Sequence, residues 1–149
     1  MKKITCFLSA ALVALAVEAQ GQTASAVQPT EANVAYGPHP RQVLDFYQAK
    51  GEGVAPLLFF IHGGGWMTGD KANPDFLAQC LADGISVVSI NYRFIPDAQT
   101  QKIDPPVKAC LDDAARALQF VRSRAAAWRI DTTRIGGCGG SAGAFTALW

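Results

Sequence analysis

The sequence predicts an α/β fold with a mostly parallel sheet and crossover helices. Three observations support this prediction. The 149 residues are 50% hydrophobic and 17% charged, as in a globular domain. Short apolar runs alternate along the chain with helical patterns, and two of these runs end directly in glycine clusters. Strands that alternate with helices form parallel sheets with right-handed crossovers.

Two early segments have the composition of strands. Residues 43–47 are rich in residues that favour β-structure, and a glycine turn at 51–53 follows them. Residues 57–61 form an unbroken apolar run, which is typical of a central parallel strand covered on both faces. We therefore expect two strands before the first glycine cluster.

The sequence pattern in the middle of the chain predicts a helix and then a further strand. Asn73 is expected to cap this helix, with Pro74 in its first turn and Gly84 at its end. Residues 85–90 form the next buried strand, and a polar, proline-marked loop is expected from there to Ile103.

The longest predicted helix opens at Asp104 and Pro105. Its apolar side chains step by three or four and are expected to face the core; they are Val107, Leu111, Ala114, Leu118, Val121, Ala125 and Trp128. Asp112 and Arg116, four residues apart, are expected to pair on the solvated face. A last strand at 134–138 then leads into the start of another helix.

The N-terminus has the pattern of a secretory signal peptide at residues 1–19. Lys2 and Lys3 precede an apolar run at 4–17, and small residues follow it. A membrane anchor is the alternative, but the run is shorter than the ~20 residues that span a bilayer. We expect a secreted or periplasmic protein without a membrane span in the mature chain. Residues 20–32 are then a flexible lead-in to a domain at 33–149.

Charge and cysteine content limit the classes of partner. The 13 basic and 12 acidic residues are spread along the chain, so no basic stripe predicts binding to nucleic acid. Cys80, Cys110 and Cys138 follow the leader and are expected to be small buried apolar residues. The sequence leaves open whether Cys80 and Cys110 form a disulfide, and it leaves the oligomeric state open.

The two glycine clusters together predict a serine nucleophile and the loop that stabilises its intermediates. The later cluster reads Gly139-Gly140-Ser141-Ala142-Gly143, at a predicted junction of strand and helix. A tight turn there projects the serine hydroxyl away from the backbone, and the flanking glycines allow neighbouring backbone to approach closely. The N–H group of Ala142 then points toward the reacting carbonyl at the start of a helix.

The earlier cluster reads His62-Gly63-Gly64-Gly65-Trp66 and follows the strand at 57–61. Glycines without Cβ atoms let backbone N–H groups approach a developing oxyanion, and each such donor contributes roughly 10²- to 10³-fold in rate. His62 lies at the end of a strand, where we expect it to hold the loop in shape rather than act as the general base.

At these motifs the sequence resembles the α/β-hydrolase family, in particular esterases of the hormone-sensitive-lipase and bacterial carboxylesterase groups. The resemblance covers residues 36–149 and includes both glycine clusters, Asn91-Tyr92-Arg93, and Asp113 with Ala114 and Ala115. It implies that Ser141 is the nucleophile and that Gly64, Gly65 and Ala142 supply the oxyanion amides. The resemblance also implies that these groups are supported by His62, Gly63, Trp66, Gly139 and Gly143. It gives Asp113 and Arg93 a structural rather than a catalytic role.

The resemblance also implies a carboxylesterase without a metal or organic cofactor, which acts on a small-molecule or carbohydrate ester. In this family the triad acid and histidine follow the serine. His39 and His62 are the only histidines of the sequence, and both precede Ser141. We therefore expect a partial α/β-hydrolase fold without its C-terminal strands, a fragment with at most trace activity.

Two other functions are compatible with the same residues. Residues 137–142 fit the dinucleotide pattern Gly-x-Gly-x-x-Ala, although this pattern normally opens a nucleotide domain and is followed by an acidic residue after the next strand. A hydrolase-fold protein that binds a partner without catalysis is the second alternative, and the missing histidine favours it.

Overall fold

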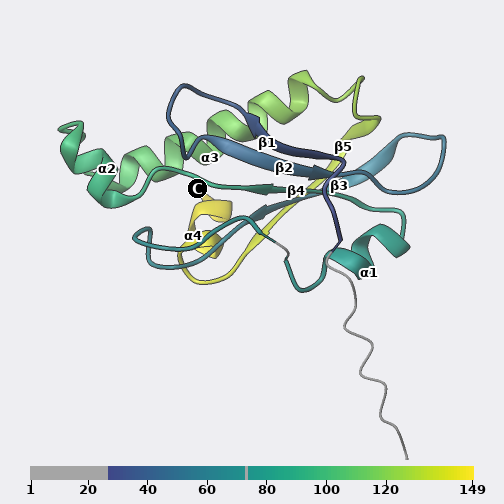
Figure 1. Cartoon of the computed structure of the whole chain (residues 1–149), viewed down its shortest axis with the longest axis horizontal. Coiled ribbons are helices and arrows are strands. Elements are labelled where there is room, and N and C mark those ends of the chain that lie inside the picture. The colour runs from purple at the N-terminus through teal and green to yellow at the C-terminus, as the bar shows by residue number, and fades with distance from the viewer. Residues whose placement is uncertain (1–26, 73) are drawn as a thin grey trace, which may run out of the picture.

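The computed structural model describes residues 27–72 and 74–149, which form a five-stranded sheet flanked by helices (Figure 1). The strand order is β1-β2-β4-β3-β5. The strands are β1 (Glu31–Ala35), β2 (Val43–Tyr47), β3 (Ala55–Ile61), β4 (Ser86–Ile90) and β5 (Ile130–Gly139). β3 is parallel to both of its neighbours, β4 and β5, whereas β1 and β2 are antiparallel. The predicted α/β fold is confirmed. The sheet is mixed rather than mostly parallel, since two of its four strand pairs are parallel and two are antiparallel.

The predicted strands are all present, and one further strand precedes them. β3 begins two residues before the predicted run, and β5 extends four residues further back, to Ile130. β1 lies partly inside the segment expected to be a flexible lead-in. Its side chains are mostly exposed, so it lacks the apolar pattern of a strand. The expected signal peptide at 1–19 lies outside the described residues.

The helices are α1 (Leu77–Ala82), α2 (Ile95–Thr100), α3 (Val107–Ser123) and α4 (Ala142–Leu148). α1 begins three residues later than Pro74, so the predicted start of that helix is wrong. α2 occupies part of the predicted loop before Ile103. The carboxylate of Asp97 accepts a hydrogen bond from the Phe94 N–H at 2.8 Å, which caps this short helix at its start.

The main core lies between the sheet and α3. Leu44, Phe46, Phe59, Ile61, Val88 and Ile90 from the strands pack there with Cys110, Ala114, Ala117 and Val121 from α3. Leu111 and Leu118, which the helical period placed in the core, are only partly buried and line a hollow between α3 and α4. A smaller cluster of Tyr47, Leu77 and Val87 lies under α1 on the other face. Figure 1 shows α1 and α3 on opposite sides of the sheet.

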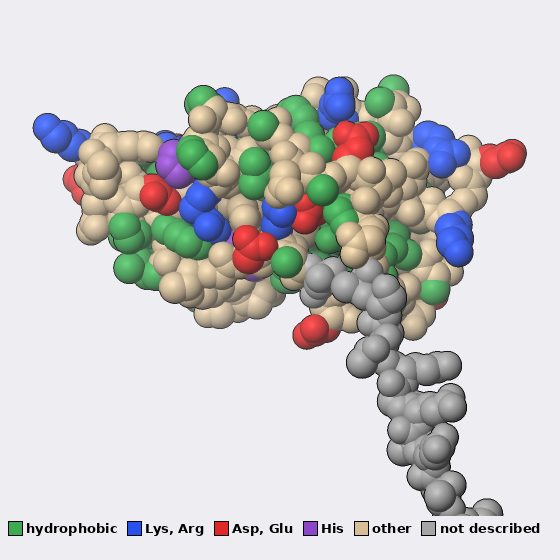
Figure 2. Space-filling model, viewed as in Figure 1, with side chains coloured by type: hydrophobic (Ala, Val, Ile, Leu, Met, Phe, Trp, Pro, Cys, Tyr) green, Lys and Arg blue, Asp and Glu red, His purple; other side chains and the backbone are tan. Residues whose placement is uncertain are grey.

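The three cysteines of the described chain are free thiols, so Cys80 and Cys110 are not joined. Only Cys110 is fully buried, whereas Cys80 and Cys138 are partly exposed. No helix in residues 27–72 or 74–149 is both long and apolar enough to cross a bilayer. On the face shown in Figure 2, basic and acidic side chains are interspersed rather than gathered by sign.

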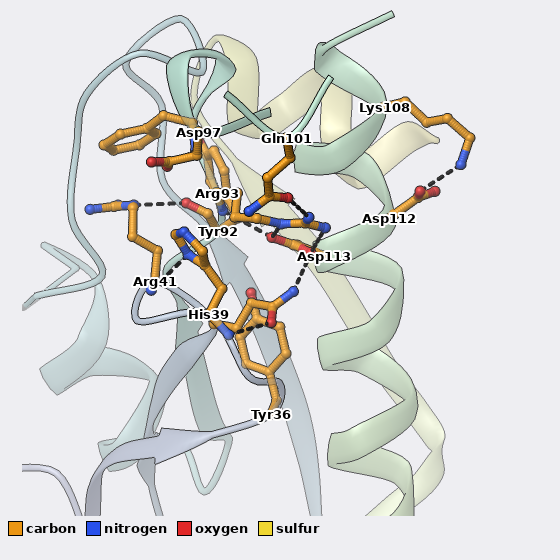
Figure 3. Close-up of polar contacts among 12 residues, drawn as sticks. Tyr36, His39, Arg41, Tyr92, Arg93, Asp97, Gln101, Lys108, Asp112 and Asp113 are labelled. Atoms are coloured by element: carbon orange, nitrogen blue, oxygen red, sulfur yellow. Dashed lines mark hydrogen bonds and ion pairs between the residues drawn. The ribbon is translucent and has the colours of Figure 1, made fainter. Parts of the chain in front are cut away.

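A buried ionic cluster ties the end of β4 to α3 (Figure 3). The carboxylate of Asp113 is fully buried and accepts hydrogen bonds from Arg93 Nε at 2.9 Å and Arg93 Nη2 at 2.7 Å. It also accepts from the Arg93 backbone N–H at 2.9 Å and from Gln42 Nε2 at 2.6 Å. The structural role expected for Asp113 and Arg93 matches this geometry. On the solvated face of α3, Asp112 pairs with Lys108 rather than with Arg116.

Replacing Asp113 is expected to destabilise the fold strongly. Asp113→Ala leaves Arg93 and Gln42 without their buried partner, and we expect it to lower the free energy of unfolding by about 3–5 kcal/mol. The neighbouring Asp112→Ala removes a half-exposed pair and should change that free energy by about 0–1 kcal/mol. Urea unfolding of the two variants measures the difference. Equal effects would show that the Asp113 cluster does not hold β4 to α3.

Candidate active site

The sheet brings the two glycine clusters together. β3 and β5 are neighbours, and Ile61, the last residue of β3, lies opposite Gly139, the last residue of β5. The loop after β3 leads to α1 on one face of the sheet, whereas α4 follows β5 and lines a hollow with α3 on the other face. Neighbouring strands whose connections diverge in this way open a crevice at their carboxyl ends, where α/β proteins bind ligands.

Ser141 lies in a strained turn between β5 and α4. Its backbone has φ 50° and ψ −119°, and the residue is exposed. A positive φ is unfavourable for a residue with a Cβ atom and persists only where the surrounding structure enforces it. The hydroxyl makes no hydrogen bond to any other residue in the described part of the chain. The hydroxyl is thus accessible on a tight strand-to-helix turn, as the predicted nucleophile requires.

Gly139 and Gly143 allow the turn to pack directly on β3. A Cβ atom on either residue would overlap the carbonyl oxygen of Ile61. Gly63 is close to the turn as well, because a Cβ there would lie 2.8 Å from the Gly140 oxygen and 3.6 Å from the Ser141 Cβ. The backbones of the two clusters are therefore in contact.

The loop after β3 has three successive residues with positive φ. The values are 103° at Gly64, 60° at Gly65 and 57° at Trp66. The carbonyl of Gly64 accepts hydrogen bonds from the N–H groups of Met67 and Thr68, at 3.0 and 3.1 Å, which closes the turn. These dihedrals favour glycine at the first two positions, while Trp66 adopts its conformation at some cost in strain.

Three backbone donors at this edge have no acceptor among the residues that the structure describes. Within the described residues, the N–H groups of Gly64, Gly65 and Ala142 donate no hydrogen bond to the backbone or to a side chain. Gly64 and Gly65 are exposed, so water can satisfy their N–H groups, whereas Ala142 is buried, and a buried donor without a partner is rare. These are the three amides that the family resemblance implied would bind an oxyanion. Ala142 directly follows Ser141, and Gly64 and Gly65 follow Gly63, which lies against the serine turn.

His62 holds the loop rather than contacting the serine. Its ring stacks on Tyr92, with centroids 4.5 Å apart, and its Nδ1 lies 2.7 Å from the Gly63 carbonyl oxygen. The Tyr92 hydroxyl donates to the His62 carbonyl at 2.9 Å. Because a carbonyl only accepts, Nδ1 carries the ring proton, and Nε2 is buried without a hydrogen-bond partner. Burial lowers the pKa of His62, so its ring is neutral near pH 7.

A second group of residues, which the sequence patterns did not predict, anchors the far end of the glycine loop. The buried Lys71 pairs with Asp45 on β2, with Nζ and Oδ2 2.8 Å apart. Its backbone N–H donates to Asn91 Oδ1 at 2.8 Å, and its carbonyl accepts from the Ser89 hydroxyl at 2.6 Å. The one available signal was Asp45, a charged residue in the middle of an apolar strand.

Arg41 holds the same loop from another side. Its Nε donates to the Tyr92 carbonyl at 2.8 Å, and Nη2 donates to the Gly69 carbonyl at 3.2 Å. Its guanidinium lies 3.5 Å from the centre of the Phe94 ring, a stacked cation–π contact. Figure 3 shows Arg41 beside Tyr92 and His39. No signal in the sequence marked Arg41 for this role.

The dinucleotide alternative fits this geometry poorly, because Gly137 and Gly139 lie inside β5 rather than in a loop that follows it. Across residues 27–72 and 74–149, no group of three or more His, Cys, Asp or Glu side chains is arranged to hold a metal ion.

Residues 44–149 match the BD-FAE family. The chain belongs to this family. Among curated proteins, it is 34% identical over 114 residues to a probable isoprenylcysteine alpha-carbonyl methylesterase from Arabidopsis thaliana, covering 75% of this chain and 25% of that protein. It is 37% identical over 90 residues to a carboxylesterase from Mycobacterium tuberculosis, covering 59% of this chain and 26% of that protein. The chain thus spans about a quarter of the length of these relatives.

Solved structures of esterases share the fold. A truncated carbohydrate esterase from gut microbiota aligns with a TM-score of 0.66 and 30% identity, over 78% of this chain and 41% of that structure. An inhibited esterase B from Lactobacillus rhamnosis aligns with the same TM-score and 25% identity, over 80% of this chain and 40% of that structure. The resemblance to α/β-hydrolase esterases is therefore confirmed.

The packing of the serine turn predicts different effects for two neighbouring glycines. Gly143→Ala places a methyl group against the Ile61 carbonyl and should lower the free energy of unfolding by about 3 kcal/mol or more, since the backbone must shift. The methyl group of Gly140→Ala meets no atom within 4 Å, so this variant should change the free energy of unfolding by about 0.5 kcal/mol or less. Chemical denaturation of both variants measures the contrast. Equal stability would contradict the close packing of the turn on β3.

The buried His62 predicts a pH dependence of stability. In the unfolded chain this residue takes up a proton near its ordinary pKa of 6.5, whereas in the folded protein its lowered pKa keeps it neutral. The unfolded state then binds more protons, so stability falls as the pH drops below 6.5, by up to about 1.4 kcal/mol per pH unit. Urea unfolding between pH 8 and pH 5 should show a smaller loss for His62→Asn than for the natural chain. Parallel pH profiles would show that His62 is not held neutral.

Proposed function

We propose that this chain supplies the nucleophile and the oxyanion-stabilising loop of a serine hydrolase that cleaves carboxylic esters through an acyl-enzyme intermediate. The observation that carries the proposal is the position of Ser141. The residue is exposed on a strained turn that contacts the glycine loop, and the N–H groups of Gly64, Gly65 and Ala142 have no acceptor in the described chain. The esterases among the relatives support the same chemistry.

The reaction assigns a separate task to each of these groups. The Ser141 oxygen attacks the acyl carbon, and the carbonyl oxygen becomes an oxyanion that the N–H groups of Gly64, Gly65 and Ala142 bind. Each donor placed there in advance lowers the barrier by about 2.7–4 kcal/mol. The bond to the alcohol oxygen then breaks, the alcohol leaves with a proton, and water hydrolyses the acyl-enzyme to release the acid.

A general base must accept the Ser141 proton, and His62 is unsuited to this task. Its Nδ1–H is engaged with Gly63, its ring is stacked on Tyr92, and neither ring nitrogen is bonded to Ser141. We therefore assign the base, and the acid that orients it, to groups outside the described residues. The relatives, about four times as long as the matched segment, leave ample sequence for both groups.

The proposed substrates are esters of small molecules or carbohydrates. The names of the relatives point to such esters, since they include a methylesterase and a carbohydrate esterase. Export from the cytoplasm is part of the proposal. Lys2, Lys3 and the apolar run at 4–17 support it, and the N-terminal sequence of the mature protein tests it.

A binding protein without catalysis is the second candidate. The observation that favours it is the absence, among the described residues, of a histidine bonded to Ser141. Such a protein would retain the fold but would neither turn over esters nor react with a fluorophosphonate, which labels only an activated serine.

Ser141→Ala tests the enzyme proposal in the natural gene product at its full length. Hydrolysis of a chromogenic acetyl ester should fall by at least about 10³-fold, because the nucleophile is removed while the oxyanion donors remain. The control, Ser123→Ala, removes an exposed hydroxyl at the end of α3 and should leave the rate unchanged.

The same preparations are treated with a fluorophosphonate, and intact-mass spectrometry locates the adduct. We expect labelling of the natural protein and of the Ser123→Ala variant but not of Ser141→Ala. Unchanged ester hydrolysis in Ser141→Ala would refute the assignment of the nucleophile. Absence of both turnover and labelling in the natural protein would favour the binding protein.

A further inference from the structure

A hydrogen bond joins the glycine loop to the helix that carries the serine. The indole Nε1 of Trp66 donates to the hydroxyl oxygen of Thr146 at 3.0 Å. We propose that this bond sets the separation between the two halves of the oxyanion site, which makes Trp66 and Thr146 positioning residues. The inference rests on the function proposed above. It assigns the positioning of the oxyanion donors to one hydrogen bond, between Trp66 Nε1 and the Thr146 hydroxyl.

The direction of each hydrogen bond is fixed by chemistry. An indole nitrogen only donates, so Thr146 must accept from Trp66. The single proton of the Thr146 hydroxyl is then free for the Ala142 carbonyl, which it reaches at 2.8 Å. Because Thr146 is only 6% exposed, water competes little for either bond. A continuous chain of contacts therefore runs from the loop through Trp66 and Thr146 to Ala142.

Trp66 is held at both ends. Its carbonyl accepts a hydrogen bond from the Ile95 N–H at 2.9 Å, at the start of α2. Its indole reaches α4 and is tilted against Phe145, with centroids 6.5 Å apart. The positive φ of 57° is a conformation that a residue with a Cβ atom avoids unless its surroundings impose it. The two bonds provide such a constraint, and they fix the exit of the glycine loop relative to α4.

The arrangement matters for catalysis because the oxyanion donors come from two separate elements. Gly64 and Gly65 belong to the loop after β3, whereas Ala142 is the first residue of α4. Thr146 lies one helical turn after Ala142 and is bonded to it, so a shift at Thr146 moves the Ala142 donor. A displacement of about 1 Å in a reacting group can reduce a rate by about 10²-fold.

The test uses four variants of the full-length gene product. Trp66→Phe keeps an aromatic ring but removes the N–H donor, and Thr146→Val keeps the shape but removes the hydroxyl. Thr146→Ser keeps the hydroxyl and serves as the rescue. The fourth variant combines Trp66→Phe with Thr146→Val. Thr100→Val is the matched control, because the exposed Thr100 hydroxyl on α2 also donates to a carbonyl four residues earlier, that of Pro96 at 3.0 Å, but accepts no hydrogen bond from an indole of the described residues.

The expected result is a selective loss of kcat. Trp66→Phe and Thr146→Val should each lower kcat by about 10-fold or more while KM changes by less than about 2-fold, since the bond acts on transition-state geometry. The double variant should be little worse than either single variant, because both remove one interaction. Thr146→Ser and Thr100→Val should stay near the natural rate. Fluorophosphonate labelling of Ser141 should slow in parallel with kcat.

The outcomes separate this inference from the function on which it rests. A natural protein that neither hydrolyses esters nor reacts with the fluorophosphonate overturns both. If the natural protein is active and its Trp66→Phe variant keeps the natural kcat, only the positioning role is overturned. The same holds if the double variant loses kcat by the product of the two single-variant decreases. If Thr146→Val fails to fold, as judged by circular dichroism, Trp66→Phe and Thr146→Ser still decide the question.

Discussion

The contact between the end of β3 and the turn at Ser141 is the constraint on which the rest of the site depends. It exists because Gly139 and Gly143 have no side chain to separate the turn from the Ile61 carbonyl. Parallel pairing places Ile61 opposite Gly139, so the chain leaves both strands at the same edge and turns toward opposite faces. From this one contact follow the strained backbone of Ser141, its exposure, and the approach of the glycine loop.

A glycine loop in this position needs support from outside itself, since its own residues offer little packing. Four sets of contacts provide it. The His62 ring and Tyr92 hold its first residues, and Trp66 joins it to α4. Lys71, with Asp45 and Asn91, holds its far end, and Arg41 bonds the Gly69 carbonyl. Among the described residues, the buried side-chain nitrogens and oxygens have partners, apart from Nε2 of His62. Buried hydrogen bonds of this kind define one geometry where apolar contacts alone would tolerate several.

Much of this architecture follows from the sequence. The apolar run at 57–61 and the helical period after Asp104 predict the centre of the sheet and its main helix, because burial imposes those patterns. The two glycine clusters predict the site residues, since close backbone approach requires glycine. No comparable pattern in the sequence marks β1, which exposes most of its side chains, or α2, half of whose residues are exposed. The same is true of Lys71, Arg41 and Thr146. Each of those three side chains has a partner that is distant in the sequence: Asp45 for Lys71, Gly69 for Arg41 and Trp66 for Thr146. Such pairings arise only from the fold.

The central claim is that the two glycine clusters form one oxyanion site around Ser141. A crystal structure of the full-length protein with a phosphonate bound covalently to Ser141 tests it most directly, because the phosphoryl oxygen marks the position of the oxyanion. The claim predicts that oxygen within about 2.7–3.1 Å of the backbone nitrogens of Ala142 and of Gly64 or Gly65. A phosphoryl oxygen that faces solvent, or an adduct on another residue, would contradict it.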